Sequence, residues 1–589
     1  MMSIQEFVHA LEVGEGRRYV KLAGTLLGLL FLLAVYDVRE FRNFSTSEAM
    51  DVSQLARNIS EGRGYVTDCI RPFSLFLVQR ERTDRDMQLR TGHPDIVNPP
   101  VYPLLLAAWM KIMPMDYYLQ RGVRFLKYQP EVLIAFLNQI LFFGVLLTTY
   151  LLGRAIFDPM VGLVSSIMVA LTEVMWRFSV SGLSTMLLAL IFLGVVGCFV
   201  VAEKLAEKED VKSGRLALVA VGIGLLLGIG MLTRYAFGVL AIPSIIYLAW
   251  GFPKRRLLMS MSACLIFMMV VTPWLVRNYR LSGSPFGVAG YAVLEETQRF
   301  PDTRLQRSLN PDFSKAGPVD IFRKLVLNSS ELIQNDLPRM GQNWISAFFL
   351  VGMLIPFQGK GLIRLRRFGV GTLAVLFVAQ ALFRTHSTTE SPVVNGDNLL
   401  VLMFPLVAIF GVAMYETLLD HIRLPFPEAR HLVTGGLLLI SSLPLVLTLL
   451  PPRTFPVAYP PYHPPVIQQS ANWLAQEDLM MSDIPWAVAW YGKRPCVWNT
   501  LSVEPDFYTL NDLTKPVKGL YLTQVTTDTK LSSEILLGAD FAWQRFALDA
   551  VLRTNLPAGF PLKHGRRDFQ EAGQIFLTDR NRWAGRSTQ

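Results

Sequence analysis

The chain has 589 residues, of which 51% are hydrophobic and only 17% are charged, and its mean hydropathy is +0.35. Because soluble proteins carry about 25% charged residues, this composition excludes an ordinary soluble protein and predicts a membrane protein. The formal net charge of +10 fits cytoplasmic Lys and Arg residues and membrane lipids as partners. No basic face interleaved with aromatic residues is present, so no nucleic acid partner is expected.

Eleven apolar stretches are predicted to cross the membrane, because a span needs about 20 predominantly apolar residues. The first, 19–36, is followed by no small-residue cleavage site and is interpreted as a retained anchor. The predicted fold class is a polytopic α-helical membrane protein with about 11 transmembrane helices. The other ten stretches are 131–153, 159–175, 183–201, 216–232, 235–250, 257–275, 342–357, 368–384, 399–418 and 432–451.

Lys and Arg in the short loops set the predicted orientation, because such loops stay on the cytoplasmic side. The segment before the first span, the loop "PKRR" (253–256) and the loop "QGKGLIRLRR" (358–367) are basic. The loops 203–215 and 419–431 fall on the same side. The prediction is a multi-pass protein of the bacterial inner (plasma) membrane, with a cytoplasmic N-terminus and an extracytoplasmic C-terminus.

This threading divides the chain into a membrane domain, 1–451, and a C-terminal extracytoplasmic α/β domain, 452–589. The membrane domain has two long external loops, 37–130 and 276–341. Within the first, the apolar stretch 99–114 is too short for a span and suits an interfacial helix. No G-x-G-x-x-G turn or P-loop is present, so no nucleotide is expected. In the C-terminal domain, the predicted strands are 478–483, 494–499, 519–525 and 573–579, and the predicted helices are 485–493 and 531–553.

Two carboxylates, Glu48 and Asp51, lie one helical turn apart in "NFSTSEAMDVSQLARNISEGRGY" (43–65). The residues from Ser45 to Glu48 match the capping box S-x-x-E, which explains them as the start of a helix without chemistry. The alternative is catalytic: a carboxylate just outside the membrane can take a proton from an acceptor hydroxyl that attacks a sugar. The residues fit either interpretation, or both together.

Cationic residues are predicted at the same face of the membrane. Arg234 lies between two spans, Arg277 follows the span 257–275, and Arg384 and His386 follow the span 368–384. A lipid phosphate that leaves during a reaction needs such partners. A single interfacial Arg commonly snorkels to lipid headgroups, whereas cations at the ends of several spans favour a phosphate site.

Four stretches of the chain carry a resemblance to a known family. They are "SEAMDVSQLARNISEGRGY" (47–65), "NPPVYPLLLAAWMKIMP" (98–114), "GMLTRYAFGVLAIP" (230–243) and "TPWLVRNYRLSGSPFG" (272–287). Together they resemble the GT-C glycosyltransferases, in particular the family 39-like branch of protein O-mannosyltransferases and aminoarabinose transferases. The resemblance implies a GT-C-like fold and transfer of a sugar, with inversion, from a polyprenyl-phosphate donor to an acceptor hydroxyl outside the cytoplasm. It implies a lipid, glycan or protein acceptor, and neither a cofactor nor a metal.

The resemblance also implies roles for individual residues. Glu48 is the expected catalytic base, and Asp51 orients it or helps to bind the acceptor. The chain departs from the family at Ala49, in place of its second acidic residue, at Asn98, in place of a common Lys, and at Asn398, in place of an Arg. The residues expected at the donor phosphate are Arg277, Arg234, Arg384 and His386, and those expected to line the substrate are Tyr102, Tyr279, Asn278 and Asn98.

Two acidic pairs and two cysteines remain as further candidates. The D-x-D in "TDRD" (83–86) and the pair Glu295-Glu296 are more typical of solvated surface than of a metal site. Cys69 and Cys496 both fall outside the cytoplasm in this threading, and their spacing gives no support for a disulfide between them.

Two other functions stay open from the sequence. A transporter or flippase would show repeated spans and ionisable residues in mid-span, whereas the notable charges here lie at span ends. A non-catalytic membrane scaffold of the same fold would keep the helices without the acidic pair, and Ala49 is consistent with it.

Overall fold

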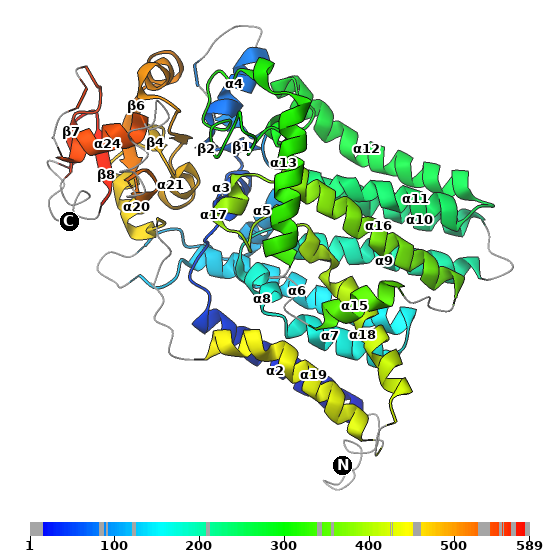
Figure 1. The fold of residues 1–589 in the computed structure, drawn as a ribbon. Helices are drawn as coiled ribbons and strands as arrows, with labels where there is room; N and C mark the ends of the chain where they lie inside the picture. Colours follow the sequence, from blue (N-terminus) through cyan, green and yellow to red (C-terminus); the bar gives the residue numbers. More distant parts are fainter. Residues whose placement is uncertain are drawn as a thin grey trace.

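The computed structural model describes residues 16–81, 88–89, 92–119, 125–207, 213–337, 344–354, 359–423, 426, 428–450, 461–527, 542–552, 556–557, 559–566 and 573–583. Helices dominate this part of the chain. A sheet and its helices lie at one end of the bundle, on the side of the C-terminus (Figure 1).

Each predicted span contains a helix in the structure. In Figure 1, α9 to α12 and α16 run alongside one another, and α2 and α19 form a pair at the edge. The helices are α2 (Gly16–Arg39), α6 (Gln129–Ile156), α7 (Pro159–Ala170), α9 (Thr185–Ala206), α10 (Ser213–Thr233), α11 (Ala241–Gly251), α12 (Arg256–Ser282), α15 (Ile345–Leu354), α16 (Lys360–Phe383), α18 (Phe404–His421) and α19 (Ala429–Leu449).

Six helices in the described ranges are long and apolar enough to cross a membrane, and a seventh span results if α7 and α8 (Glu173–Val180), bent by 62°, count as one. The chain is therefore a multi-pass membrane protein, and the total of about 11 spans stays a prediction. One detail of that prediction is wrong, because no single helix covers 159–175. Thr172 has an extended backbone (φ −86°, ψ 114°) that ends the helical run, as suits a β-branched residue.

Close packing of the bundle depends on glycine at several helix crossings, such as those of α6 with α7 and of α10 with α12. A Cβ atom on Gly153 of α6 would lie 2.7 Å from the Cα atom of Gly162 in α7, and one on Gly224 of α10 would lie 2.3 Å from the carbonyl oxygen of Ala263 in α12. Small residues let helix backbones approach in a membrane, where no hydrophobic force drives helices together. The outer faces carry exposed apolar side chains such as Leu265 of α12, which suits contact with lipid.

A six-stranded sheet has the strand order β2-β5-β4-β6-β8-β7. The first four strands in this order are parallel, and β8 and β7 continue the sheet antiparallel. Each strand predicted from the sequence overlaps one of β4, β5, β6 and β8. The bounds are β2 (Cys69–Ile70), β4 (Leu479–Ser482), β5 (Cys496–Trp498), β6 (Val517–Leu522), β7 (His564–Gly565) and β8 (Ile575–Thr578).

The first external loop joins this sheet through β2, which the predicted division at residue 451 does not include. Cys69 in β2 is the direct partner of Cys496 in β5. Both thiols are buried and unbonded, and burial raises the pKa of both well above the usual value. Sequence spacing offered no reason to pair these cysteines, because a two-residue edge strand has no recognisable pattern.

Prolonged oxidation of the purified protein is expected to link Cys69 to Cys496, but slowly, because burial raises the pKa of both thiols and the thiolate is the reactive form. Adjacent strands lie about 4.8 Å apart, within the Cα–Cα range of about 4.4–6.8 Å that a disulfide spans. Mass spectrometry of a non-reducing digest would detect the linked peptides, with Cys496→Ser as the control. If the two cysteines stay unlinked after complete oxidation, β2 does not occupy the edge of this sheet.

Helix α21 (Pro485–Gly492) docks the sheet onto the membrane part of the chain. Arg57 of α3 (Ser47–Ser60), a fully buried side chain, donates to the carbonyl oxygens of Trp490 and Ala489 at 2.7 and 2.8 Å. Glu131 at the start of α6 accepts from the Trp490 indole at 2.8 Å and from the Tyr491 hydroxyl at 2.6 Å. Both buried side chains therefore hold α21 against α3 and α6.

The remaining helices and strands are short, and α5 and β1 among them pack against α3. The apolar stretch 99–114 forms α5 (Val101–Ile112), whose twelve residues are too few for a span, as predicted. The predicted helix 531–553 contains α24 (Ala542–Leu552) in its described part. The other elements are β1 (Val66–Thr67), β3 (His93–Pro94), α4 (Pro72–Glu81), α13 (Pro318–Glu331), α17 (His386–Glu390), α20 (Pro464–Asn472) and α22 (Gln524–Thr527).

Candidate active site

A cavity of about 630 Å³ lies where α3, the two external loops, the end of α10, α17 and α21 meet. It places charged groups beside a surface that an apolar chain can contact. The polar part of its wall includes Glu48, Asp51, Arg71, Asn98, Arg234, Glu295, His386 and Asp397. The apolar part includes Met231, Val239, Phe267, Phe286, Val288 and Phe383.

Glu48 lies in the first turn of α3 and lines the cavity. Its Oε1 accepts a hydrogen bond from Arg234 at 3.2 Å, and its Oε2 accepts one from the backbone N–H of Gly396 at 2.9 Å. The capping-box interpretation is wrong, because the N-cap residue Thr46 makes no side-chain cap bond and the Glu48 carboxylate is engaged elsewhere. The Glu48 side chain is 25% exposed and that of Asp51 only 2%, so Glu48 is the carboxylate that a substrate can reach.

Arg234, in the break between α10 and the 3-10 helix Tyr235–Leu240, joins two carboxylates. Besides Glu48, its Nη2 donates to Asp397 Oδ1 at 2.7 Å. Asp397 Oδ2 accepts from the backbone N–H and the hydroxyl of Thr385, at 2.9 and 2.7 Å. Burial alone would raise the pKa of Asp397, but the ion pair with Arg234 and these hydrogen bonds lower it. Asp397 is therefore a charged anchor that positions Arg234 against Glu48.

Gly396 packs directly against the Arg234–Glu48 pair. A Cβ atom on Gly396 would lie 1.9 Å from Arg234 Nη1 and 2.2 Å from Glu48 Oε2. No side chain fits at this position unless the ends of the Arg234 and Glu48 side chains move, so glycine leaves the space that this ion pair occupies.

Asp51 binds a different arginine, Arg71, which follows strand β2 directly. Its Oδ2 accepts from Arg71 Nη2 at 2.7 Å and from the Asn98 amide at 3.4 Å, and its Oδ1 accepts from Gln54 at 3.1 Å. The other terminal nitrogen of Arg71, Nη1, is buried and has no hydrogen-bond partner among the described residues. Because a buried donor without an acceptor is costly, Arg71 is suited to bind an anion in the cavity.

Asp95 is buried behind this wall and orients Asn98. It accepts from the backbone N–H groups of Val97 and Asn98, at 3.0 and 2.7 Å, and from the Asn98 amide at 3.2 Å. Burial, together with the charge of Asp51, raises the pKa of Asp95 to about 6. These contacts hold the Asn98 side chain toward Asp51, so Asn98 lies in the cavity wall.

Glu295 brings the second external loop into the cavity wall. Its carboxylate accepts a hydrogen bond from Gln306, and Lys324 of α13 donates to its backbone carbonyl at 2.5 Å. Burial raises the pKa of Glu295 to about 7 and lowers that of Lys324 to about 8. The interpretation of Glu295 as solvated surface is wrong, since its side chain is buried. The charge of this wall therefore changes near neutral pH.

The C-terminal part of the chain contributes an aromatic side to the cavity. Trp486 of α21 lines the cavity, and its indole N–H donates to the Tyr462 hydroxyl at 3.1 Å. His386 also lines the cavity, with its ring centroid 5.3 Å from that of Trp498. Burial and the nearby charge of Arg71 lower the pKa of His386 to about 4. His386 is therefore uncharged at neutral pH, and its expected contact with a phosphate would be a hydrogen bond instead of an ion pair.

Arg277, predicted to hold the donor phosphate, does not line the cavity. Its Nη1 donates to the backbone carbonyl of Asp95 at 2.9 Å, and its guanidinium lies 5.0 and 4.4 Å from the ring centroids of Tyr65 and Trp274. Cation–π contacts of this kind fix an arginine in place. Arg277 therefore supports the segment that carries Asn98 from behind.

Arg384 and Tyr279 also lie away from the cavity wall. Arg384 is buried and pairs with Glu331 at 3.0 Å and with Asp336 at 3.8 Å, both within the second loop. The extended backbone at Arg384 (φ −56°, ψ 133°) directs it away from its neighbour Thr385, which faces the cavity. Tyr279 is exposed on α12.

Tyr102 and Asn278 adjoin the cavity without lining it. Tyr102 lines a smaller cavity of about 60 Å³ that Glu48 shares, and its hydroxyl donates to the Gly182 carbonyl at 2.8 Å. The Asn278 amide donates to the hydroxyl of Tyr235 at 2.9 Å, and Tyr235 lines the main cavity. Both side chains therefore position parts of the wall.

Three residues at the centre of the site escape sequence reasoning: Arg71, Gly396 and Asp397. Arg71 lies in a loop with many arginines, and its place after the edge strand β2 is what distinguishes it. Gly396 and Asp397 directly precede Asn398, a position where the sequence already departs from the resembling family. The one signal for them in the sequence was therefore the charged residue Asp397, next to the unusual Asn398.

The described ranges contain no group of three or more His, Cys, Asp or Glu side chains that could hold a metal ion. The D-x-D at 83–86 lies outside the described residues. The expectation that the site needs no metal stays an expectation.

A family model and the solved structures indicate what the chain is similar to. Residues 98–276, less than half of the chain, match the model of the dolichyl-phosphate-mannose-protein mannosyltransferases. This range contains α5 and Arg234 and extends into α12. No individual curated protein matches the chain by sequence.

Two solved structures share the fold. ArnT from Cupriavidus metallidurans, bound to undecaprenyl phosphate, matches with a TM-score of 0.52 and 12% identity, over 96% of this chain and 99% of that protein. The oligosaccharyltransferase AglB from Archaeoglobus fulgidus, in complex with an inhibitory peptide and a dolichol-phosphate, matches with a TM-score of 0.52 and 12% identity, over 88% of this chain and 72% of that protein. The predicted resemblance to GT-C glycosyltransferases is confirmed at the level of the fold.

Proposed function

We propose that this chain is an integral-membrane glycosyltransferase that transfers a sugar from a polyprenyl-phosphate donor to an acceptor hydroxyl. The observation that carries the proposal is one cavity in which Glu48, Arg71 and Arg234 lie beside an apolar wall. The match to a mannosyltransferase family and the fold shared with two proteins bound to lipid phosphates support it.

The donor binds with its phosphate at Arg71 and Arg234 and with its prenyl chain along the apolar wall. Arg71 Nη1 has no hydrogen-bond partner among the described residues, and guanidinium groups match phosphate oxygens in geometry and charge. Met231 of α10 and Phe267 of α12 belong to the apolar wall. Since both helices are candidate spans, the prenyl chain can reach this wall from the membrane.

The transfer is a single displacement at the anomeric carbon. The acceptor oxygen forms the new bond to that carbon while the bond from the carbon to the phosphate oxygen breaks, and the electron pair leaves with the polyprenyl phosphate. Glu48 takes the proton of the acceptor hydroxyl, and Arg71 and Arg234 stabilise the leaving phosphate. Attack opposite to the leaving group inverts the configuration. This chemistry uses side chains alone and needs no cofactor.

The reaction takes place at the extracytoplasmic face of a bacterial inner membrane in this proposal. The charges of the short loops support that orientation, because basic loops stay in the cytoplasm. The acceptor is a lipid, a glycan or a protein, and it reaches Glu48 from the side that α21 and the C-terminal part of the chain enclose.

Purified protein in nanodiscs, with radiolabelled polyprenyl-phosphate sugars and an envelope extract as acceptor, tests the proposal. Wild type is expected to move label to the acceptor. Arg71→Met is expected to lose about 10- to 100-fold in kcat/KM, because a hydrogen bond to a charged group contributes about 1.5–3 kcal/mol. Arg280→Met, at an exposed arginine of α12, is the matched control. If well-folded wild type accepts no donor, the non-catalytic scaffold is favoured instead.

Donor affinity is expected to rise as the pH falls through about 7. Glu295 loses its negative charge below that value, and Lys324 gains a positive charge below about 8, so both changes favour an anion in the cavity. Undecaprenyl phosphate should bind about threefold more tightly on the acid side. In Glu295→Gln, the larger part of this pH dependence of donor affinity should be lost. Because the phosphate of the donor titrates equally with both proteins, its contribution cancels when the two pH profiles are subtracted. Equal pH profiles would contradict the role of Glu295.

A further inference from the structure

Helix α13 in the second external loop carries an uncovered apolar face. Val319, Phe322, Val326 and Leu327 are 79%, 66%, 50% and 60% exposed. Positions 319, 322 and 326 lie at the spacing i, i+3 and i+7, which is one face of a helix. An apolar stripe of this size on a short helix is typical of a surface that contacts another phase or molecule.

The opposite face of α13 packs against the rest of the molecule and carries two polar side chains that are hydrogen-bonded to it. Lys324 donates to the carbonyl oxygens of Ala292, Glu295 and Arg384, at 2.9, 2.5 and 2.8 Å. The amide of Asn328 donates to the carbonyl oxygen of Ala381, near the end of α16, at 2.8 Å. The orientation of α13 is therefore fixed, and its apolar side is turned outward.

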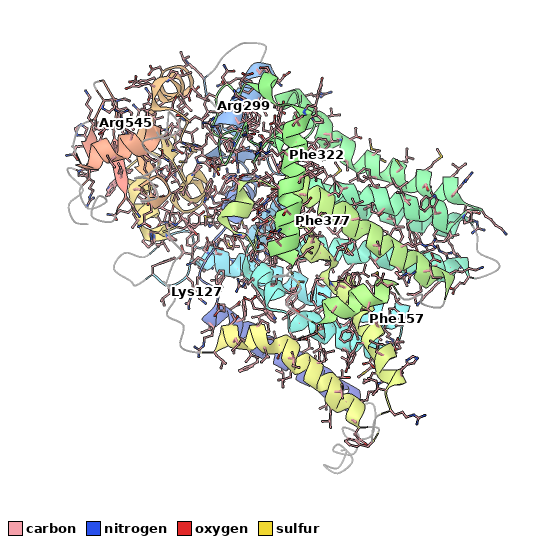
Figure 2. All side chains as sticks on the ribbon, in the orientation of Figure 1. Lys127, Phe157, Arg299, Phe322, Phe377 and Arg545 are labelled. Atoms are coloured by element: carbon pink, nitrogen blue, oxygen red, sulfur yellow. The ribbon has the colours of Figure 1, made fainter. Side chains whose placement is uncertain are left out.

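The position of α13 in the fold indicates which surroundings its apolar face contacts. In Figure 1, α13 runs across the ends of α12 and α16 on the side of the site. It packs against α16, and Figure 2 labels Phe322 on α13 and Phe377 on α16. The apolar face of α13 therefore continues the lipid-facing surface of the helix bundle at the level where the bundle ends.

We propose that α13 lies in the headgroup region of the bilayer, with Val319, Phe322 and Val326 in contact with acyl chains. An amphipathic helix lowers its free energy when its apolar face is buried at the boundary between lipid headgroups and acyl chains. Lys324 on the inner face of α13 connects the helix to the cavity. It binds the backbone carbonyls of Glu295, which lines the cavity, and of Arg384, which directly precedes the cavity residue Thr385. Contact of α13 with the lipid therefore helps to position the cavity wall that contains Glu295.

Depth-dependent quenching in nanodiscs tests the position of α13. A fluorescent label is attached to Phe322→Cys or Val319→Cys, in a background with Cys198→Ser and Cys264→Ser. Cys69 and Cys496 are buried in the folded protein and stay unlabelled. The nanodiscs contain a lipid with a nitroxide either near the headgroup or at the end of an acyl chain.

Two further labelled positions calibrate the measurement. Leu265→Cys, on the exposed face of the span α12, represents the membrane interior. Leu513→Cys represents water, because Leu513 is an equally apolar residue, 52% exposed, beside the sheet. All four positions are exposed, so the substitutions remove no packed side chain and the folded proteins are directly comparable.

The label at 322 or 319 is expected to be quenched at least about threefold more than the label at 513, and most strongly by the nitroxide near the headgroup. The label at 265 should respond most to the nitroxide at the chain end. Quenching at 322 and 319 equal to that at 513 would overturn the proposal. So would a label that is shielded from both nitroxides, since a protein would then cover α13. Neither readout depends on glycosyl transfer, so this inference and the proposed function fail separately.

Discussion

Glu48→Gln is expected to lower kcat for glycosyl transfer by about 100- to 10,000-fold, the usual contribution of a positioned general base. Glutamine has the same shape and keeps one oxygen acceptor for Arg234 or for the Gly396 N–H, but it cannot take a proton from the acceptor. Binding of undecaprenyl phosphate should therefore change little. Single-turnover transfer at saturating donor, together with a separate binding measurement, would distinguish the two effects.

Asp51→Asn provides the comparison that identifies the base. Asp51 is almost fully buried and pairs with Arg71 at 2.7 Å, so its loss should weaken donor binding more than it slows turnover. Glu61→Gln, at the exposed end of α3, is the matched control, because exposed ion pairs contribute at most about 1 kcal/mol. If Asp51→Asn abolishes turnover while Glu48→Gln retains it, the two carboxylates exchange roles in the mechanism.

The helices could be predicted from the sequence because the signal for them is local. A run of apolar residues predicts a membrane helix wherever it occurs, and helices occur within all eleven predicted ranges. The strands near Met480, Val497, Leu520 and Leu577 were found for the same reason, since each is a short apolar run between polar residues. The edge strand β2 has two residues and no such pattern, so its place beside Cys496 could not be predicted.

The site was harder to predict because its contacts join distant parts of the chain. Glu48 was predicted as a site residue and lies in the cavity wall, but the capping box that explained its place in the sequence was wrong. Its partner Arg234 lies 186 positions away in sequence, and Gly396 lies 348 positions away. An ion pair of this kind overrides a cap bond, because capping contributes only about 1 kcal/mol.

The arginines also show that the sequence does not predict contacts between distant segments. Arg277 and Arg384 lie at span ends in the sequence, where a phosphate-binding residue is expected, yet both side chains bind other partners. Arg71 carries no recognisable motif and lines the cavity. The position of a residue along a span predicts how deep its side chain lies in the membrane. The direction in which that side chain points depends on the loops that pack against it.

Gly396→Ala is expected to lower kcat/KM by about 100-fold, the usual loss when a catalytic group moves by about 1 Å. The added methyl group would lie within 2.2 Å of both Arg234 Nη1 and Glu48 Oε2, so the proposed base and the proposed phosphate-binding arginine must both move. Overpacking of this kind costs about 1–3 kcal/mol of stability, which thermal unfolding would report. Gly436→Ala in α19, where a Cβ atom meets nothing within 4 Å, should leave transfer and stability nearly unchanged.

The double variant Gly396→Ala, Glu48→Gln tests whether the two residues act as one unit. If Gly396 matters because it leaves room for Glu48 and Arg234, then the methyl group has little left to disturb once the base is gone. The double variant should therefore turn over only slightly more slowly than Glu48→Gln alone, as expected for groups that act together. Losses that multiply would mean that Gly396 acts apart from the base, through the loop that carries Asp397, and the steric account of this position would then be wrong.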